Sequence, residues 1–149
     1  MTPRINGPWS AAEIERYLSR TIIPLRLACL SDSAWPMMFS LWYVHRDGQL
    51  WCATQSDSVV TRALEVNSRC AFEIAPNEPP YNGIRGQGVA SIGAGNAKGV
   101  LSDLIDRYLG GMESSLARWL MSRADHETAI RISPNHLTSW DYSRRMGSR

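Results

Sequence analysis

The residues best suited to binding a ligand lie where an apolar segment ends, in Gln55-Ser56-Asp57-Ser58. Each of the last three residue types can cap the start of a helix, and a helical pattern follows them. The first N–H groups of a helix have no partner within it, so they would lie beside serine hydroxyls. Amides and hydroxyls in this arrangement suit an anion such as a phosphate.

No set of residues typical of catalysis stands out. His45, His126 and His136 fall in three different segments, and nothing in the sequence places two of them together. The nucleophile motif G-x-S-x-G is missing from the sequence. Asp103 and Asp106 are three residues apart on a predicted amphipathic helix, where they fit its exposed face. The sequence therefore identifies no catalytic residue.

The three cysteines indicate buried, reduced thiols rather than a metal or redox site. Cys29, Cys52 and Cys70 each lie in a separate predicted strand, without C-x-x-C spacing. Cysteine is among the residue types most often buried. We expect no metal site and a reducing, cytoplasmic location.

A predicted β-hairpin followed by a helix positions the anion-binding stretch. Two apolar runs, Met37 to Val44 and Gln49 to Thr54, flank Asp47-Gly48, and this dipeptide is a strong hairpin signal. The helix should run from about Ser58 to Glu65.

The rest of the chain adds short strands and three more helices. We expect helices at 11–18, 97–109 and 113–123, and strands at 24–31, 69–75, 84–92, 128–133 and 137–142, the last two separated by Pro134-Asn135. About seven strands, mostly adjacent in sequence, predict a mainly β (α+β) protein. Its architecture should be an antiparallel barrel with helices outside it, in one domain spanning residues 1–149.

Composition is that of a soluble globular protein. Of its 149 residues 44% are hydrophobic and 20% charged, and the net charge of +2 is too small to favour nucleic acid or a membrane surface. No apolar segment approaches the roughly 18 residues that a membrane span needs. The six Trp residues fit either the core or a flat aromatic cofactor, and Trp42, Trp51 and Trp140 lie on predicted strands.

Several spaced motifs together resemble one family. They are Pro36 with the run to Trp42-Tyr43, Asp47-Gly48-Gln49-Leu50-Trp51 ending in Ala53-Thr54, Leu64 with Asn67 and Arg69, the segment 81–88, and Ile132-Ser133-Pro134 leading to Trp140-Asp141. Their order resembles the flavin-binding split-barrel family, the pyridoxamine 5'-phosphate oxidase-like proteins and their deazaflavin-dependent relatives. The resemblance extends from Leu25 to Tyr142.

This resemblance implies a six-stranded antiparallel split barrel that forms a homodimer, with two flavin sites between the subunits. The isoalloxazine ring would meet Ser40, Leu41 and Trp42. Ala53 and Thr54 would follow the ribityl chain, and Ser56 and Ser58 would face the phosphate. Trp140 occupies the place where the oxidases bring a tryptophan from the partner chain.

The sequence departs from the family at the phosphate. The oxidases carry an Arg-Lys pair there, whereas this chain has Val59-Val60. Two charge-assisted contacts are therefore missing, each worth about 1.5–3 kcal/mol. Arg62, one turn after Ser58 on the same helical face, can replace one of them.

The leading hypothesis is a homodimeric, FMN-binding oxidoreductase of this family that acts on an unknown small molecule. One rival is a reductase of the same fold that uses the deazaflavin F420. Another is a cofactor-free, dimeric binding or interaction protein that has lost the phosphate clamp. None of the three requires nucleic acid or a membrane.

Overall fold

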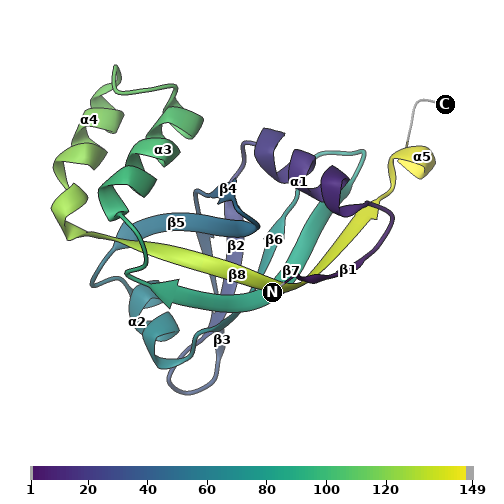
Figure 1. Cartoon of the computed structure of the whole chain (residues 1–149), viewed down its shortest axis with the longest axis horizontal. Coiled ribbons are helices and arrows are strands. Elements are labelled where there is room, and N and C mark those ends of the chain that lie inside the picture. Colours follow the sequence, from purple (N-terminus) through teal and green to yellow (C-terminus); the bar gives the residue numbers. More distant parts are fainter. Residues whose placement is uncertain (1, 147–149) are drawn as a thin grey trace.

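The computed structural model describes residues 2–146 of the chain. The strands are β1 (Arg4–Asn6), β2 (Leu25–Leu30), β3 (Pro36–Leu41), β4 (Val44–Arg46), β5 (Gln49–Gln55), β6 (Arg69–Ile74), β7 (Asn82–Ile92) and β8 (Glu127–Asp141). The helices are α1 (Ala11–Arg20), α2 (Val59–Val66), α3 (Ala97–Leu109), α4 (Ser115–Ser122) and α5 (Ser143–Met146), with a short 3₁₀ turn, η1 (Ala124–His126). Figure 1 shows their arrangement.

The two edge strands of the sheet are joined by a short link in the chain. Its strand order is β3-β2-β6-β7-β8-β5-β4, and β1 adds to β8 in parallel. The strands at the two ends, β3 and β4, are separated in sequence by Trp42 and Tyr43 alone. The two ends of the sheet are therefore joined by the chain. The result is a barrel that is split between β3 and the hairpin formed by β4 and β5. The predicted mainly β, antiparallel split barrel with peripheral helices is confirmed.

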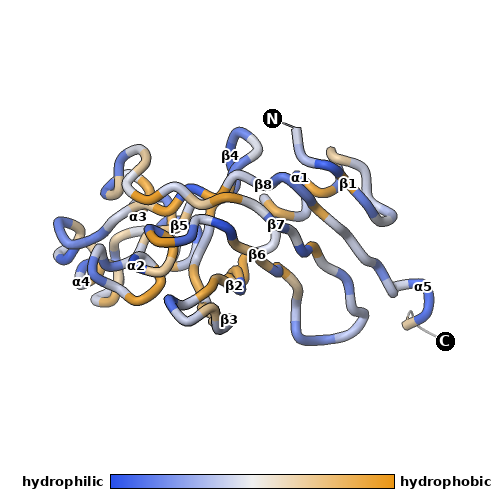
Figure 2. Tube along the Cα trace, turned by 90° about the horizontal axis from the view of Figure 1, so that it is seen from below, coloured by the Kyte–Doolittle hydropathy of each residue, from blue (hydrophilic) through white to orange (hydrophobic). Residues whose placement is uncertain are grey.

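Two helices contribute to the barrel core from opposite ends. Helix α1 begins with a capping box of Ser10 and Glu13 and buries Ile14, Tyr17 and Leu18. Helix α2 begins at Ser58 and buries Val60, Thr61, Ala63 and Leu64. The apolar side chains of both helices belong to one core cluster with residues of β2, β5, β6 and β8. In Figure 2 the loop between β6 and β7 is mostly hydrophilic, while the strands that it joins alternate between hydrophilic and hydrophobic residues.

Helices α3 and α4 form a pair over β5, away from α1 (Figure 1). Val100 and Leu104 of α3 pack with Ala129 of β8, while Ala117 of α4 packs with Leu101 and Ile105 of α3. This confirms the expected pair of helices outside the sheet. No helix within residues 2–146 is both long and apolar enough to cross a membrane.

Two predictions for the strands were wrong. The strands expected at 128–133 and 137–142 are one strand, β8, which runs through Pro134. The register on β7 shifts there, because Gln87 pairs with His136 and Gly88 with Pro134, so Asn135 is bulged out. A bulge is one of the places where a sheet accepts a proline. The run from Met37 to Val44 is conversely divided, at Trp42-Tyr43, into β3 and β4.

The hairpin turn and the cysteines agree with the sequence. Asp47 and Gly48 both have positive φ, 53° and 73°, as a two-residue turn between antiparallel strands requires. Cys29, Cys52 and Cys70 are buried and unpaired. Burial raises the pKa of the Cys52 and Cys70 thiols to about 12, so both stay protonated at neutral pH.

A cluster of polar groups fixes the Trp42-Tyr43 link. The Tyr43 hydroxyl lies 2.8 Å from the Leu18 carbonyl oxygen and 2.9 Å from that of Thr21, at the C-terminal end of α1. Arg107 of α3 donates to the same two carbonyls and to that of Ser19. A cation is favourable at a helix C-terminus, where carbonyls lack helical partners.

We expect Tyr43→Phe to lower the free energy of unfolding by about 1–2 kcal/mol, because it removes a buried hydroxyl and leaves its carbonyl partners with fewer donors. Urea unfolding followed by tryptophan fluorescence measures this. Tyr142→Phe is the matched control, since Tyr142 is 44% exposed, and it should have no measurable effect. Equal stability of the Tyr43→Phe and Tyr142→Phe variants would contradict the role given to this hydroxyl.

Candidate functional site

The stretch between β5 and α2 has the capped geometry that the sequence predicts. Ser58 is the N-cap, and its Oγ accepts from the Thr61 N–H at 3.2 Å. The Thr61 hydroxyl, 2.9 Å from the Ser58 Oγ, donates to the Gln55 carbonyl at 3.0 Å. Ser56 donates to the His126 carbonyl through both its N–H, at 2.8 Å, and its hydroxyl, at 3.0 Å. Both serine hydroxyls are therefore already bonded to protein.

The unused donors at this place are main-chain amides. Within α2, the Arg62 N–H donates to the Ser58 carbonyl and the Thr61 N–H to the Ser58 hydroxyl. The N–H groups of Val59 and Val60 come before the first helical hydrogen bond and have no protein acceptor among residues 2–146. A phosphate here would be held by these two amides rather than by the hydroxyls.

Val59 and Val60 differ sharply in their surroundings. Val59 is 52% exposed, whereas Val60 is 3% exposed and packs in the barrel core. Arg62 is exposed, and neither ion pair found in residues 2–146, Arg46–Asp103 or Lys98–Asp125, involves it. Val59 is thus a surface position at the start of α2. A longer side chain there could reach a bound anion without disturbing the core.

The structure brings the two predicted strand segments of the site together at the split. Val44 pairs with Trp51, and this ladder ends before Tyr43 and Trp42. Strands β3 and β5 are in contact, and Trp42 and Ala53 pack against the same cluster under α3. The segments 40–42 and 53–54 therefore lie near each other, and Ser56 and Ser58 follow in the chain.

Most side chains of these segments are occupied by packing. The Leu41 side chain contacts the barrel core, and Ala53 packs against the clusters under α3 and α4. The Trp42 ring is stacked on Tyr108 of α3, with centroids 4.9 Å apart and planes 4° from parallel. Leu41, Trp42 and Ala53 therefore have mainly main-chain groups left for a ligand. The sequence alone does not reveal this.

Ser40 points to the outer face of the barrel. Its hydroxyl accepts a hydrogen bond from the Arg26 guanidinium on the neighbouring strand. Arg26 is opposite Glu73, and Glu73 is opposite Arg85, so alternating charges cross β2, β6 and β7. This row adds Arg26 and Arg85 to the neighbourhood of the site.

Within one copy of the chain, Trp140 lies far along β8 from the partner of Thr54 on β5. Thr54 pairs with Thr128, and Trp140 lies twelve residues further along β8, which corresponds to about 40 Å of strand. The Arg85 guanidinium lies 5.4 Å from the centre of the Trp140 ring. Trp140 therefore lies far along β8 from Thr128, beside the Arg85 end of the charged row that begins at Ser40.

Sequence reasoning missed a polar cluster beside the end of β5. Gln55 donates to Glu127 at 2.9 Å and accepts from Arg123 at 3.2 Å. Burial raises the pKa of the Glu127 carboxyl, against the opposing effects of Gln55 and Arg123. Arg123 also lies over the Trp119 ring, 4.7 Å from its centre. Arg123 is 68 residues from Gln55, and no local signal pairs them.

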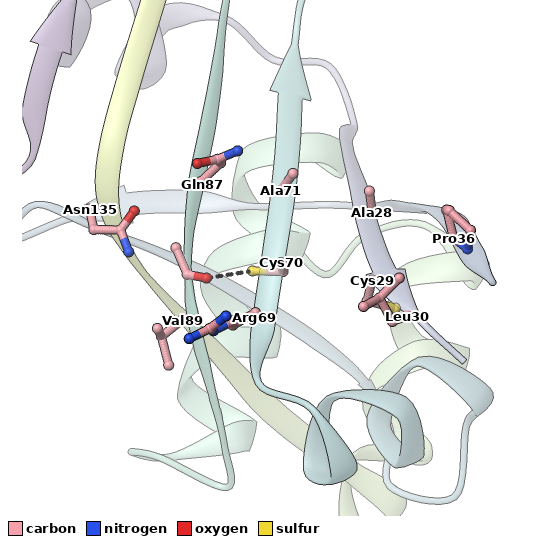
Figure 3. A pocket seen from close by; sticks show the side chains of 11 residues that line it. Ala28, Cys29, Leu30, Pro36, Arg69, Cys70, Ala71, Gln87, Val89 and Asn135 are labelled. Atoms are coloured by element: carbon pink, nitrogen blue, oxygen red, sulfur yellow. Dashed lines mark hydrogen bonds between the residues drawn. The ribbon is translucent and has the colours of Figure 1, made fainter. Parts of the chain in front are cut away.

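Two adjoining cavities lie on the outer face of the sheet. One, of about 630 Å³, is lined by residues including Ala28, Ala71, Gln87 and Val89 (Figure 3). The second, of about 420 Å³, shares the first three and adds Arg26, Arg85 and His136. The second cavity is floored by a row of paired residues across β3, β2, β6, β7 and β8, namely Met38, Ala28, Ala71, Gln87 and His136, and the middle three also line the first cavity. Small side chains in the middle of this row make it a trough.

Comparison with known proteins identifies the fold. No model of a known family matches the sequence, and no curated protein does. Among solved structures, a conserved hypothetical protein from Mycobacterium tuberculosis is 21% identical, with a TM-score of 0.80 over 97% of this chain and 92% of that one.

Two further structures show the same likeness. An F420 reductase is 18% identical, with a TM-score of 0.69 over 83% of this chain and 94% of that one. A candidate pyridoxamine 5'-phosphate oxidase from Listeria innocua is 14% identical, with a TM-score of 0.60 over 78% and 86%. The chain thus has the split-barrel fold of the pyridoxamine 5'-phosphate oxidase-like proteins, as the resemblance in its sequence implied.

Proposed function

We propose that the protein is a homodimeric oxidoreductase that binds FMN at the split of the barrel and acts on a small molecule. The flavin would supply the hydride chemistry, and the protein would orient it and exclude water. The proposal rests on three features that follow one another along the structure: the split, the two serines and the unused amides. The split between Ser40–Trp42 and Ala53–Thr54 leads through Ser56 and Ser58 to the unused amides of Val59 and Val60.

In the proposal, each part of FMN has its own place in this arrangement. The ring would lie along the main chain of Ser40, Leu41 and Trp42, since the Trp42 side chain already stacks on Tyr108. The ribityl chain would follow Ala53 and Thr54. The phosphate would meet the amides of Val59 and Val60, with Arg62 reaching back from the next turn.

The partner copy is proposed to cover the outer face. This face exposes large apolar side chains, with Met38 65% and Val89 43% exposed at the lining of its cavities. Exposed apolar surface next to a trough of small residues is typical of an interaction site. A second copy would also bring its own Trp140 toward the flavin, since within one copy about 40 Å of strand separates Trp140 from the partner of Thr54.

The same geometry accommodates a deazaflavin, and one likeness favours that alternative. The F420 reductase matches this chain with a higher TM-score than the candidate pyridoxamine 5'-phosphate oxidase, 0.69 against 0.60. Binding of F420 in place of FMN would keep the site and change the cofactor. A protein that takes up neither molecule would be the cofactor-free binding protein.

Titration of the purified protein with FMN, followed by quenching of flavin fluorescence, tests the cofactor. We expect saturable binding that Arg62→Ala weakens about five- to tenfold, because it removes the cation nearest the α2 start on the helical face of Ser58. Arg16→Ala is the matched control, since Arg16 is likewise exposed on a helix. If the wild type binds F420 and not FMN, the proposed cofactor is wrong and F420 takes its place. Unchanged FMN affinity in Arg62→Ala would refute the contact between Arg62 and the phosphate.

A gain of affinity tests the phosphate position more sharply. We expect Val59→Arg to strengthen FMN binding about tenfold, because Val59 is exposed beside the free amides and a guanidinium there adds a charge-assisted contact. Val66→Arg is the control, since Val66 is 73% exposed at the other end of α2 and gives the same change in charge. Equal effects of the two substitutions would place the phosphate elsewhere.

Sedimentation equilibrium tests the proposed dimer. We expect twice the mass of the chain for the wild type and the mass of one chain for Ala71→Glu, which places a charge in the trough. Ala12→Glu, on the exposed face of α1, should remain dimeric. Trp140→Ala should keep the dimer and weaken FMN binding. A monomeric wild type, or an Ala71→Glu variant as dimeric as Ala12→Glu, would rule out this interface.

A further inference from the structure

A separate pocket lies beneath α1, between this helix and strands β1, β4, β5 and β8. Its volume is about 170 Å³. Its inner walls are apolar side chains that are at most 6% exposed, namely Ile14, Leu18, Leu50 and Leu137. Thr2, Pro3, Glu15 and Gly48 also line it. None of the residues assigned to the flavin lines this pocket.

One imidazole stands against these apolar walls. His45 of β4 lines the pocket and pairs with Leu50 of β5. Burial lowers the pKa of His45, and its ring has no hydrogen-bond partner in the part of the chain that the structure describes. Glu15 of α1 and Asp47 of the turn act against this lowering, while Arg107 of α3 adds to it. The imidazole is therefore neutral at pH 7, with a ring nitrogen able to accept a hydrogen bond.

The size and lining of the pocket restrict what it can hold. An apolar cavity of about 150 Å³ in another protein takes up benzene, so this volume is suited to a single six-membered ring. Apolar walls disfavour any charged group, and the Glu15 carboxylate at the lining disfavours an anion in particular. The His45 ring nitrogens are not among the buried polar atoms without a partner, so a ligand hydroxyl would donate to the imidazole in place of water.

We propose that this pocket binds a small, uncharged ligand made of one apolar ring and one hydroxyl group, with the ring among Ile14, Leu18 and Leu137 and the hydroxyl donating to His45. The site is independent of the cofactor, so its test does not depend on whether the protein binds a flavin. Phenol has this chemistry, and benzene has the ring without the hydroxyl.

Isothermal titration of the full-length protein with phenol and with benzene tests the proposal. We expect the wild type to bind phenol more tightly than benzene. His45→Phe should weaken phenol binding about fivefold and leave benzene binding unchanged, because it removes the acceptor and retains a ring of similar size. Equal loss for both molecules, or no loss for either, would overturn the place given to the hydroxyl.

Two substitutions that fill the pocket test its location. Ala11→Trp adds a large side chain at the lining, and Ile14→Phe adds volume from the inner wall; both should weaken phenol and benzene binding at least tenfold. Ala12→Trp is the matched control, since Ala12 is an exposed neighbour that does not line the pocket. Absence of saturable phenol binding by the wild type, or unchanged affinity in both filled variants, would refute the pocket as a ligand site.

Discussion

The architecture depends on how two residues are held between β3 and β4. Trp42 and Tyr43 join the opposite ends of the sheet, so fixing them fixes the closure of the barrel. The Tyr43 hydroxyl and the Arg107 guanidinium share the last carbonyls of α1, and Tyr108 bonds both the Tyr43 N–H and the Ile23 carbonyl. One buried polar cluster thereby joins α1, α3 and the split. Most of its polar groups bond one another, while the buried Arg107 Nε has no partner within residues 2–146, so the cluster favours one arrangement of the link.

That closure limits what the split can offer a ligand. Trp42 is stacked on Tyr108, and Leu41 and Ala53 are packed against apolar clusters, so their side chains already stabilise the fold. What stays available is main chain at the split and at the start of α2, with serine hydroxyls bonded to protein. A cofactor site built from main-chain groups constrains the shape of its ligand more than its charge. In the proposed flavin site, main-chain amides would therefore take the place of the side-chain cations that the family's oxidases carry.

Sequence reasoning succeeded for this protein where local preferences decide the structure. The Asp47-Gly48 turn follows from residues that tolerate positive φ, and the start of α2 follows from the hydroxyl of Ser58 beside unpaired amides. An antiparallel barrel followed from the order of such segments, and the resemblance to the family implied that the barrel is split. The prediction of two strands separated at Pro134 was wrong, because a bulge at Asn135 keeps β8 continuous. Whether a proline ends a strand depends on the strand beside it.

The sequence by itself determined the turns, the helix starts, the alternation of apolar residues and therefore the class of fold. Only the tertiary structure decided which side chains remain free to bind. Val59 and Val60 are identical residues side by side, yet one is exposed and the other is in the core. Arg107, Arg123 and Tyr108 likewise meet partners 65 to 89 residues away. Local preferences act within a few residues, whereas burial and long-range partners are set when the barrel closes and every element competes for the same core.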